Sequence, residues 1–201
     1  GKKEGEEKKD PFLHGQPVIL VAGLGNQSVT PDSLGPRTVN NLNVSQNETG
    51  LKAIAPGVMA QTGMETARIL SGLIREIKPD LVIAIDALAA RSIRRLGTTI
   101  QLTDTGIHPG SGVGNHRHSL TKETLGIPVL AVGVPTVVGA AAIVHDTISA
   151  LTGVLASEEA TKNTGKWIEN MNPEDQYRMI RELLEPEFGS LYVTPPDIDQ
   201  R

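Results

Sequence analysis

The sequence has 201 residues, no cysteine, five aromatic residues and a formal net charge of −4. The lack of cysteine excludes disulfides, thiolate nucleophiles, cysteine-ligated zinc and iron–sulfur clusters, and the few aromatics argue against a stacking platform for single-stranded nucleic acid. Because 19 basic residues stand against 23 acidic ones, the chain has no basic footprint for a phosphate backbone, and we expect no direct nucleic-acid binding.

The chain is expected to consist of an N-terminal arm, residues 1–16, and a single α/β domain, residues 17–201. The first ten residues, GKKEGEEKKD, carry no apolar side chain that could be buried, so we expect a mobile arm. The sequence contains no apolar run of membrane-spanning length and no secretory signal. It therefore predicts a soluble cytoplasmic protein that does not bind a membrane.

Short apolar runs alternate with helical patterns from Pro17 onward. Continuous apolar character is typical of strands buried on both faces, as in a parallel sheet. The predicted strands cover 18–22, 52–55, 81–85, 98–102 and 129–132. The predicted helices begin near Pro36, at a capping box at Thr62, and at Asn172, and also cover 87–96 and 137–151. This alternation predicts a three-layer α/β/α domain with a mostly parallel sheet.

Glycine, proline and polar residues gather in four segments that follow predicted strands: 23–32, 86–89, 104–115 and 133–136. In an open parallel sheet, ligands bind beyond the carboxyl ends of the strands. Because glycine lets the backbone approach a ligand closely, the edge where these segments would meet is the expected site. The first segment begins as a dinucleotide-binding motif but has Ser28 at the third glycine position, so nucleotide binding is not favoured.

Three aspartates in these segments each have a structural alternative to catalysis. Asp86 directly follows a predicted buried strand, where it either caps the next helix or acts as a catalytic carboxylate. Asp32 lies in a turn that enters a helix, and Asp104 follows the next predicted strand, with the same alternatives. His108 lies in the glycine-rich segment, where an exposed histidine without a role is common. No G-x-S-x-G motif occurs, so serine hydrolase chemistry has no support.

Two carboxylates at one site favour acid–base chemistry. At about 4 Å and an effective dielectric constant near 20, two like charges repel by roughly 4 kcal/mol, which separates their pKa values by about 3 pH units. Asp32 and Asp86 could then hydrolyse a peptide, one taking a proton from water and the other polarising the carbonyl. The same pair with His108 could instead bind a divalent metal. His116 and His118 have a spacing that can hold a metal, but two histidines are a weak signal.

Six longer segments are more specific than any of these short motifs: 23–26, 29–36, 55–63, 78–92, 104–115 and 125–138. Together they resemble the germination (spore) protease family of endospore-forming bacteria. The resemblance runs from about Val18 to Val144, with a looser match through 192–195. The family's long N-terminal region is nearly absent here, and the segments 43–50 and 157–165 are shorter than the family's.

The resemblance implies an atypical aspartic-type endopeptidase that degrades small acid-soluble spore proteins during germination. It also implies a zymogen and a homotetramer. We further expect a location in the spore core and no cofactor. The family's two critical aspartates match Asp32 and Asp86. The expected supporting residues are Gly23, Gly25, Asn26, Asp104 and His108. The family's fold is akin to that of hydrogenase-maturation endopeptidases, which use a metal, so a metal-dependent endopeptidase stays open, as does a non-catalytic α/β binding module.

Overall fold

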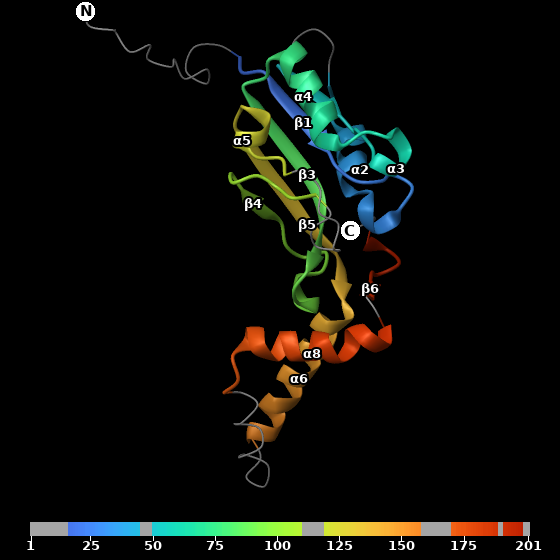
Figure 1. Cartoon of the computed structure of the whole chain (residues 1–201), viewed down its shortest axis with the longest axis vertical. Coiled ribbons are helices and arrows are strands. Elements are labelled where there is room, and N and C mark those ends of the chain that lie inside the picture. The colour runs from blue at the N-terminus through green and yellow to red at the C-terminus, as the bar shows by residue number, and fades with distance from the viewer. Residues whose placement is uncertain (1–15, 45–49, 110–118, 158–169, 189–190, 199–201) are drawn as a thin grey trace, which may run out of the picture. The chain divides into compact units, whose positions relative to one another are not determined.

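The computed structural model describes residues 16–44, 50–109, 119–157, 170–188 and 191–198 (Figure 1). The chain divides into two compact units, of which the first holds residues 1–86 and 101–133 and the second holds residues 87–100 and 134–201. The predicted arm lies almost wholly outside the described residues. The prediction of a single domain over 17–201 stays a prediction.

A mixed, mostly parallel sheet forms the centre of the first unit and confirms the predicted fold class. The strand order is β2-β1-β3-β5-β4. β1 pairs in parallel with both β2 and β3, whereas β4 runs antiparallel to β5 at the edge. The strand bounds are β1 Ile19–Gly23, β2 Leu51–Ile54, β3 Leu81–Ala90, β4 Gln101–Thr103 and β5 Val129–Gly139. Buried apolar side chains such as Leu20 and Val82 explain why these runs become inner strands.

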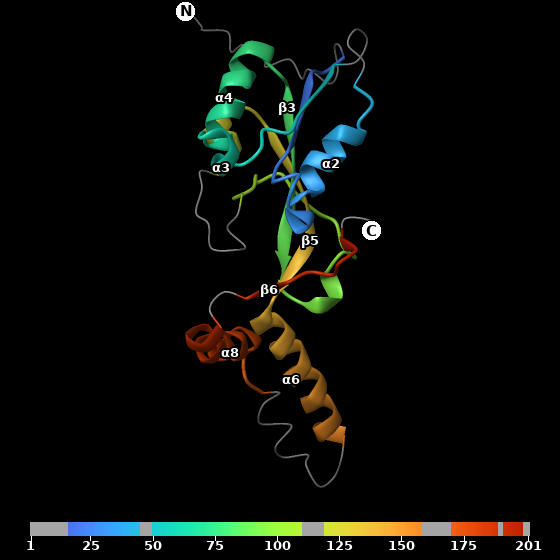
Figure 2. The same ribbon diagram turned by 90° about the vertical axis from the view of Figure 1, so that its right-hand side faces the viewer.

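Helices of the first unit lie on both sides of this sheet, with α2 on one side and α4 on the other (Figure 2). α2 packs against β1, and α4 packs against α5. Leu70 and Ile74, four residues apart on α4, are both buried and form its inner face. The bounds are η1 Thr30–Asp32, α2 Leu34–Asn41, α3 Met59–Thr62, α4 Thr66–Ile77 and α5 Lys122–Leu125.

The predicted capping box at Thr62 is wrong, although the helix that it was expected to open exists. Thr62 ends the single turn of α3, and Gly63 follows it with a φ of 69°. α4 begins only at Thr66. The left-handed conformation of Gly63 interrupts the helical backbone, so the two helices stay separate.

Two strands are longer than predicted, and this displaces two predicted helices. β3 continues to Ala90, so the predicted helix over 87–96 is replaced by the short 3-10 helix η2, Ile93–Arg95. β5 continues to Gly139, so α6 (Ala140–Ser157) begins three residues later than the predicted helix over 137–151. Ala90 and Val138, near the ends of the two strands, are buried together with Ala142 of α6. This small-residue core holds the extended ends in place.

The second unit contains the ends of β3 and β5, η2, α6, α8 (Pro173–Phe188) and β6 (Tyr192–Val193). α8 confirms the helix predicted from Asn172, and it packs against α6. The apolar side chains of α8 are only partly buried, because Ile180 is 4% exposed while Leu183 is 69% exposed.

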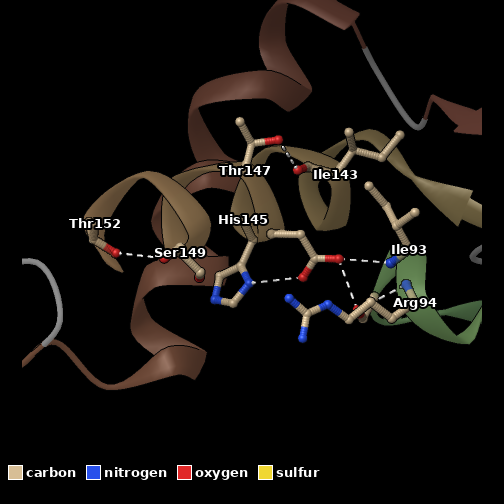
Figure 3. Close-up of polar contacts among 9 residues, drawn as sticks. Ile93, Arg94, Ile143, His145, Thr147, Ser149 and Thr152 are labelled. Atoms are coloured by element: carbon tan, nitrogen blue, oxygen red, sulfur yellow. Dashed lines mark hydrogen bonds and ion pairs between the residues drawn. The ribbon is translucent and has the colours of Figure 1, made fainter. Parts of the chain in front are cut away.

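Asp146 connects α6 to η2 within the second unit, and Figure 3 shows its neighbours Ile93 and His145. Its Oδ2 accepts hydrogen bonds from the Ile93 N–H at 2.8 Å and the Ser92 hydroxyl at 2.9 Å. His145 Nδ1 lies 3.8 Å from the other carboxylate oxygen. Serine and histidine thus both contact the aspartate, whereas a serine-protease triad needs histidine between the other two. The cluster joins two elements and does not activate a serine.

Candidate active site

Asp86 lies inside β3, not beyond its end. The strand continues for four residues after it, so Asp86 neither caps a helix nor begins a loop as predicted. Asp86 is 5% exposed, and its side chain shares a face of the strand with the buried Val82 and Ala84. An ionised carboxylate in such a place costs free energy unless polar groups surround it. A buried aspartate in an otherwise aliphatic strand is therefore a strong candidate for a functional group.

The loop after β1 is folded around Asp32. The Asn26 N–H donates to Asp32 Oδ2 at 2.7 Å. Gly25 has a φ of 112°, and a Cβ at this position would stand 2.1 Å from the Asp32 carbonyl oxygen and 3.0 Å from Oδ1. Only glycine can therefore approach Asp32 this closely. The predicted supporting residues Gly25 and Asn26 both contact the predicted catalytic Asp32.

One backbone junction relates this loop to the strand of Asp86. The Leu24 N–H donates to the Ile85 carbonyl at 2.7 Å, which extends the pairing of β1 with β3. A Cβ at Gly35 would stand 2.4 Å from Leu24 N and 2.6 Å from the Ile85 carbonyl oxygen, so α2 begins directly on this junction. Asp32 precedes Gly35 by three residues, and Asp86 follows Ile85. The two aspartates thus flank one crowded meeting point of β1, β3 and α2.

The predicted supporting residue Gly23 belongs to the same junction. It is the last residue of β1 and pairs with Ile85 of β3. A Cβ at Gly23 would stand 2.1 Å from the carbonyl oxygen of Gly35 and 2.8 Å from a side-chain methyl group of Val39. Glycine at this position therefore lets α2 lie close enough to β1 to define the position of the Asp32 loop.

Asn26 also connects the Asp32 loop to α3. Its Oδ1 accepts hydrogen bonds from the Ser28 N–H at 3.0 Å and from Gln61 Nε2 at 2.9 Å. Gln61 Oε1 in turn accepts from the Val58 N–H at 3.3 Å. Gln61 lies in the segment 55–63, and the sequence alone indicates no role for it. The one local signal for Gln61 was its position as a polar residue between Gly57 and Gly63, two glycines that interrupt the helical pattern.

Asp104 and His108 lie on a different stretch of the first unit. Because β4 is antiparallel to its neighbour, its carboxyl end points in the opposite direction from those of the parallel strands. The expectation that segments 104–115 and 23–32 leave the sheet at the same edge assumed that all strands are parallel. That expectation is therefore wrong. The side chains of Asp104 and His108 are exposed. The segment 133–136, also expected to be a strand-end loop, lies inside β5.

The described residues contain neither a metal-binding cluster nor a membrane-spanning helix. No group of three or more histidine, aspartate or glutamate side chains there could hold a metal ion. His116 and His118 lie outside the described ranges. Asp32, Asp86 and His108 therefore do not form such a group. In the same part of the chain, no helix is both long and apolar enough to cross a bilayer.

Residues 12–166 match a family model described as germination protease. The chain belongs to the germination protease family. It is 51% identical to the germination protease of Caldanaerobacter subterraneus subsp. tengcongensis and 44% identical to that of Clostridium acetobutylicum, each over 195 residues. These alignments cover 90% of this chain and 60% of each relative, so the chain spans about 60% of the length of the relatives. The resemblance to the germination protease family is thereby confirmed.

Among solved structures, this germination protease family member shows a weaker structural similarity to one other protease. The NiFe hydrogenase maturation protease HycI from Thermococcus kodakarensis KOD1 matches with a TM-score of 0.41 and 22% sequence identity. The match covers 62% of this chain and 77% of that protein. The α/β class itself rests on the sheet and helices of the first unit.

Proposed function

We propose that this chain carries the active centre of an atypical aspartic-type endopeptidase that degrades small acid-soluble spore proteins during germination. Membership of the germination protease family supports peptidase activity. The observation that carries the residue assignment is the junction at Ile85. Beside it lie Asp86, which is 5% exposed, and the loop in which Asp32 accepts the Asn26 N–H.

The proposed chemistry is attack by an activated water molecule. The ionised member of the pair Asp32 and Asp86 takes a proton from water as the water oxygen bonds to the peptide carbonyl carbon. The protonated member donates a hydrogen bond to the carbonyl oxygen, where negative charge develops. When the carbon–nitrogen bond breaks, the carboxyl group that took the proton from water gives it to the leaving amine, which restores the ionised carboxylate. The chain has no cysteine that could replace the water as nucleophile.

The other residues of the proposal act around this pair. Gly23, Gly25 and Asn26 define the shape of the loop that holds Asp32. Asp104 and His108 keep a supporting role in the proposal through the family resemblance alone. On the same basis we propose a zymogen, a homotetramer and action in the spore core, on protein substrates without direct nucleic-acid binding.

The proposal is tested by incubating the purified protein with a small acid-soluble spore protein and identifying fragments by mass spectrometry. We expect discrete internal cleavages, while an unrelated unfolded protein of similar size stays intact. We also expect the rate to be unchanged across a chelator series. A spore protein that is bound but never cleaved would instead support a binding module. Activity lost with chelator and restored by added metal would support the metal-dependent endopeptidase.

A further inference from the structure

We propose that Gln61 is a positioning residue for Asp32 and acts through Asn26. The inference rests on the proposed function, because it takes Asp32 to be part of the hydrolytic pair. Gln61 Nε2 donates to Asn26 Oδ1 at 2.9 Å, and the Asn26 N–H donates to Asp32 Oδ2 at 2.7 Å. Two hydrogen bonds thus connect a side chain of α3 to the carboxylate, and the first of them joins residues 35 positions apart in the sequence.

The backbone around α3 defines which way the Gln61 amide faces. The Val58 N–H donates to Oε1, so the oxygen of the amide lies toward α3 and the nitrogen is left to donate to Asn26. Gly57 has a φ of 74°, and a Cβ there would stand 3.1 Å from Gln61 Oε1. The glycine therefore gives the amide the space that it occupies.

Asn26 converts this side-chain contact into a restraint on the loop. Its Oδ1 accepts from Gln61 and also from the Ser28 N–H at 3.0 Å, so two donors hold the side chain in one orientation. The backbone N–H of the same residue donates to Asp32. Without the Gln61 donor, the Asn26 side chain keeps only the contact inside its own loop. The hydrogen-bonded route from Gln61 to the carboxylate is then broken.

Packing does not explain the presence of glutamine at this position. The Gln61 side chain is exposed, and α3 is a single turn of four residues with no buried member. Replacing an exposed side chain outside the core normally changes stability little. An effect on turnover without an effect on folding is therefore the expected signature of positioning.

The test compares Gln61→Glu with Gln27→Glu in the purified protein. Gln61→Glu keeps an oxygen for the Val58 N–H but removes the donor to Asn26, whereas Gln27→Glu adds the same charge to the exposed part of the same loop. For Gln61→Glu we expect kcat for spore-protein cleavage to fall about tenfold with KM changed by less than about twofold, because misplaced catalytic groups slow chemistry more than binding. Gln27→Glu should retain kcat. Equal kcat values for the two variants would overturn the inference.

A double substitution shows whether Gln61 acts on kcat through Asn26 or independently of it. In an Asn26→Ala background, Gln61→Glu should cause no further loss of kcat, because its route to Asp32 is already broken. Losses that multiply would contradict the proposal. Hydrogen exchange of the Asn26 amide supplies a readout that does not depend on activity: it should become faster in Gln61→Glu and stay unchanged in Gln27→Glu. If Asp32→Asn retained turnover, the proposed function would fail, whereas unchanged amide exchange in Gln61→Glu would defeat the positioning link alone.

Discussion

Replacing Asp86 with asparagine is expected to lower kcat for spore-protein cleavage by about a hundredfold to ten-thousandfold. Asparagine has nearly the same shape as aspartate but can neither accept nor release the proton that the proposed mechanism moves. Because asparagine fits the buried position of Asp86, which is 5% exposed, we expect the variant to stay folded, with a urea midpoint close to that of the parent. The measurement is kcat and KM from initial rates, with circular dichroism as the check on folding.

The matched control for Asp86→Asn is Asp175→Asn. Asp175 lies in the first turn of α8 and pairs with Arg178, with both side chains at least half exposed. An exposed ion pair contributes little to stability, so this variant should keep both its fold and its turnover. If Asp86→Asn remained folded and cleaved within about threefold of the unsubstituted protein, general acid–base chemistry at Asp86 would be ruled out.

Replacing Gly35 with alanine is expected to destabilise the protein by about 3 kcal/mol and to abolish cleavage. A Cβ at this position would stand 2.3 Å from the Leu24 carbonyl oxygen and 2.6 Å from the Ile85 carbonyl oxygen, both of them backbone atoms. Backbone atoms of two paired strands cannot move aside as the end of a flexible side chain can. The start of α2 must shift instead, and the loop of Asp32 shifts with it. Urea unfolding measures the free-energy change.

Gly72→Ala is the control for Gly35→Ala. Gly72 lies in the interior of α4, and a Cβ there meets no atom within 4 Å. Alanine has the higher helix propensity, so this variant should be more stable by about 0.5–1 kcal/mol and retain activity. A Gly35→Ala protein as stable as the parent would show that the junction of β1, β3 and α2 tolerates displacement, and would remove the basis for placing the two aspartates beside it.

The sheet could be predicted from the sequence because its inner strands are uninterrupted apolar runs bounded by proline and glycine. The ends of β3 and β5 could not. The run ALAA of β3 fits a helix or a strand equally well. In β5 the β-branched residues of VPTVVG favour a strand, but the proline and glycine suggest a break in the sheet. Both ends are buried against α6. The antiparallel direction of β4 is also invisible locally, since a strand pattern carries no information about its partner's direction.

Part of the candidate site could also be predicted from the sequence, and part could not. Asp32 and Asp86 could be selected from the sequence because they lie in long segments shared with a recognisable family. Their structural settings could not, since Asp86 proved to be a strand residue and not a helix cap. Gln61 was missed because its contact with Asn26 spans 35 residues, and no local pattern indicates a hydrogen bond at that separation.

The central claim is that Asp32 and Asp86 act as one hydrolytic pair, and a double-substitution cycle on kcat tests it most directly. The proteins are the parent, Asp32→Asn, Asp86→Asn and the variant with both changes, measured with the same spore protein. Residues that act as a unit have strongly non-additive effects, because removing one already disables the other. We therefore expect the double variant to be about as slow as the slower single variant. Losses that multiply would contradict the account and assign the two carboxylates independent roles.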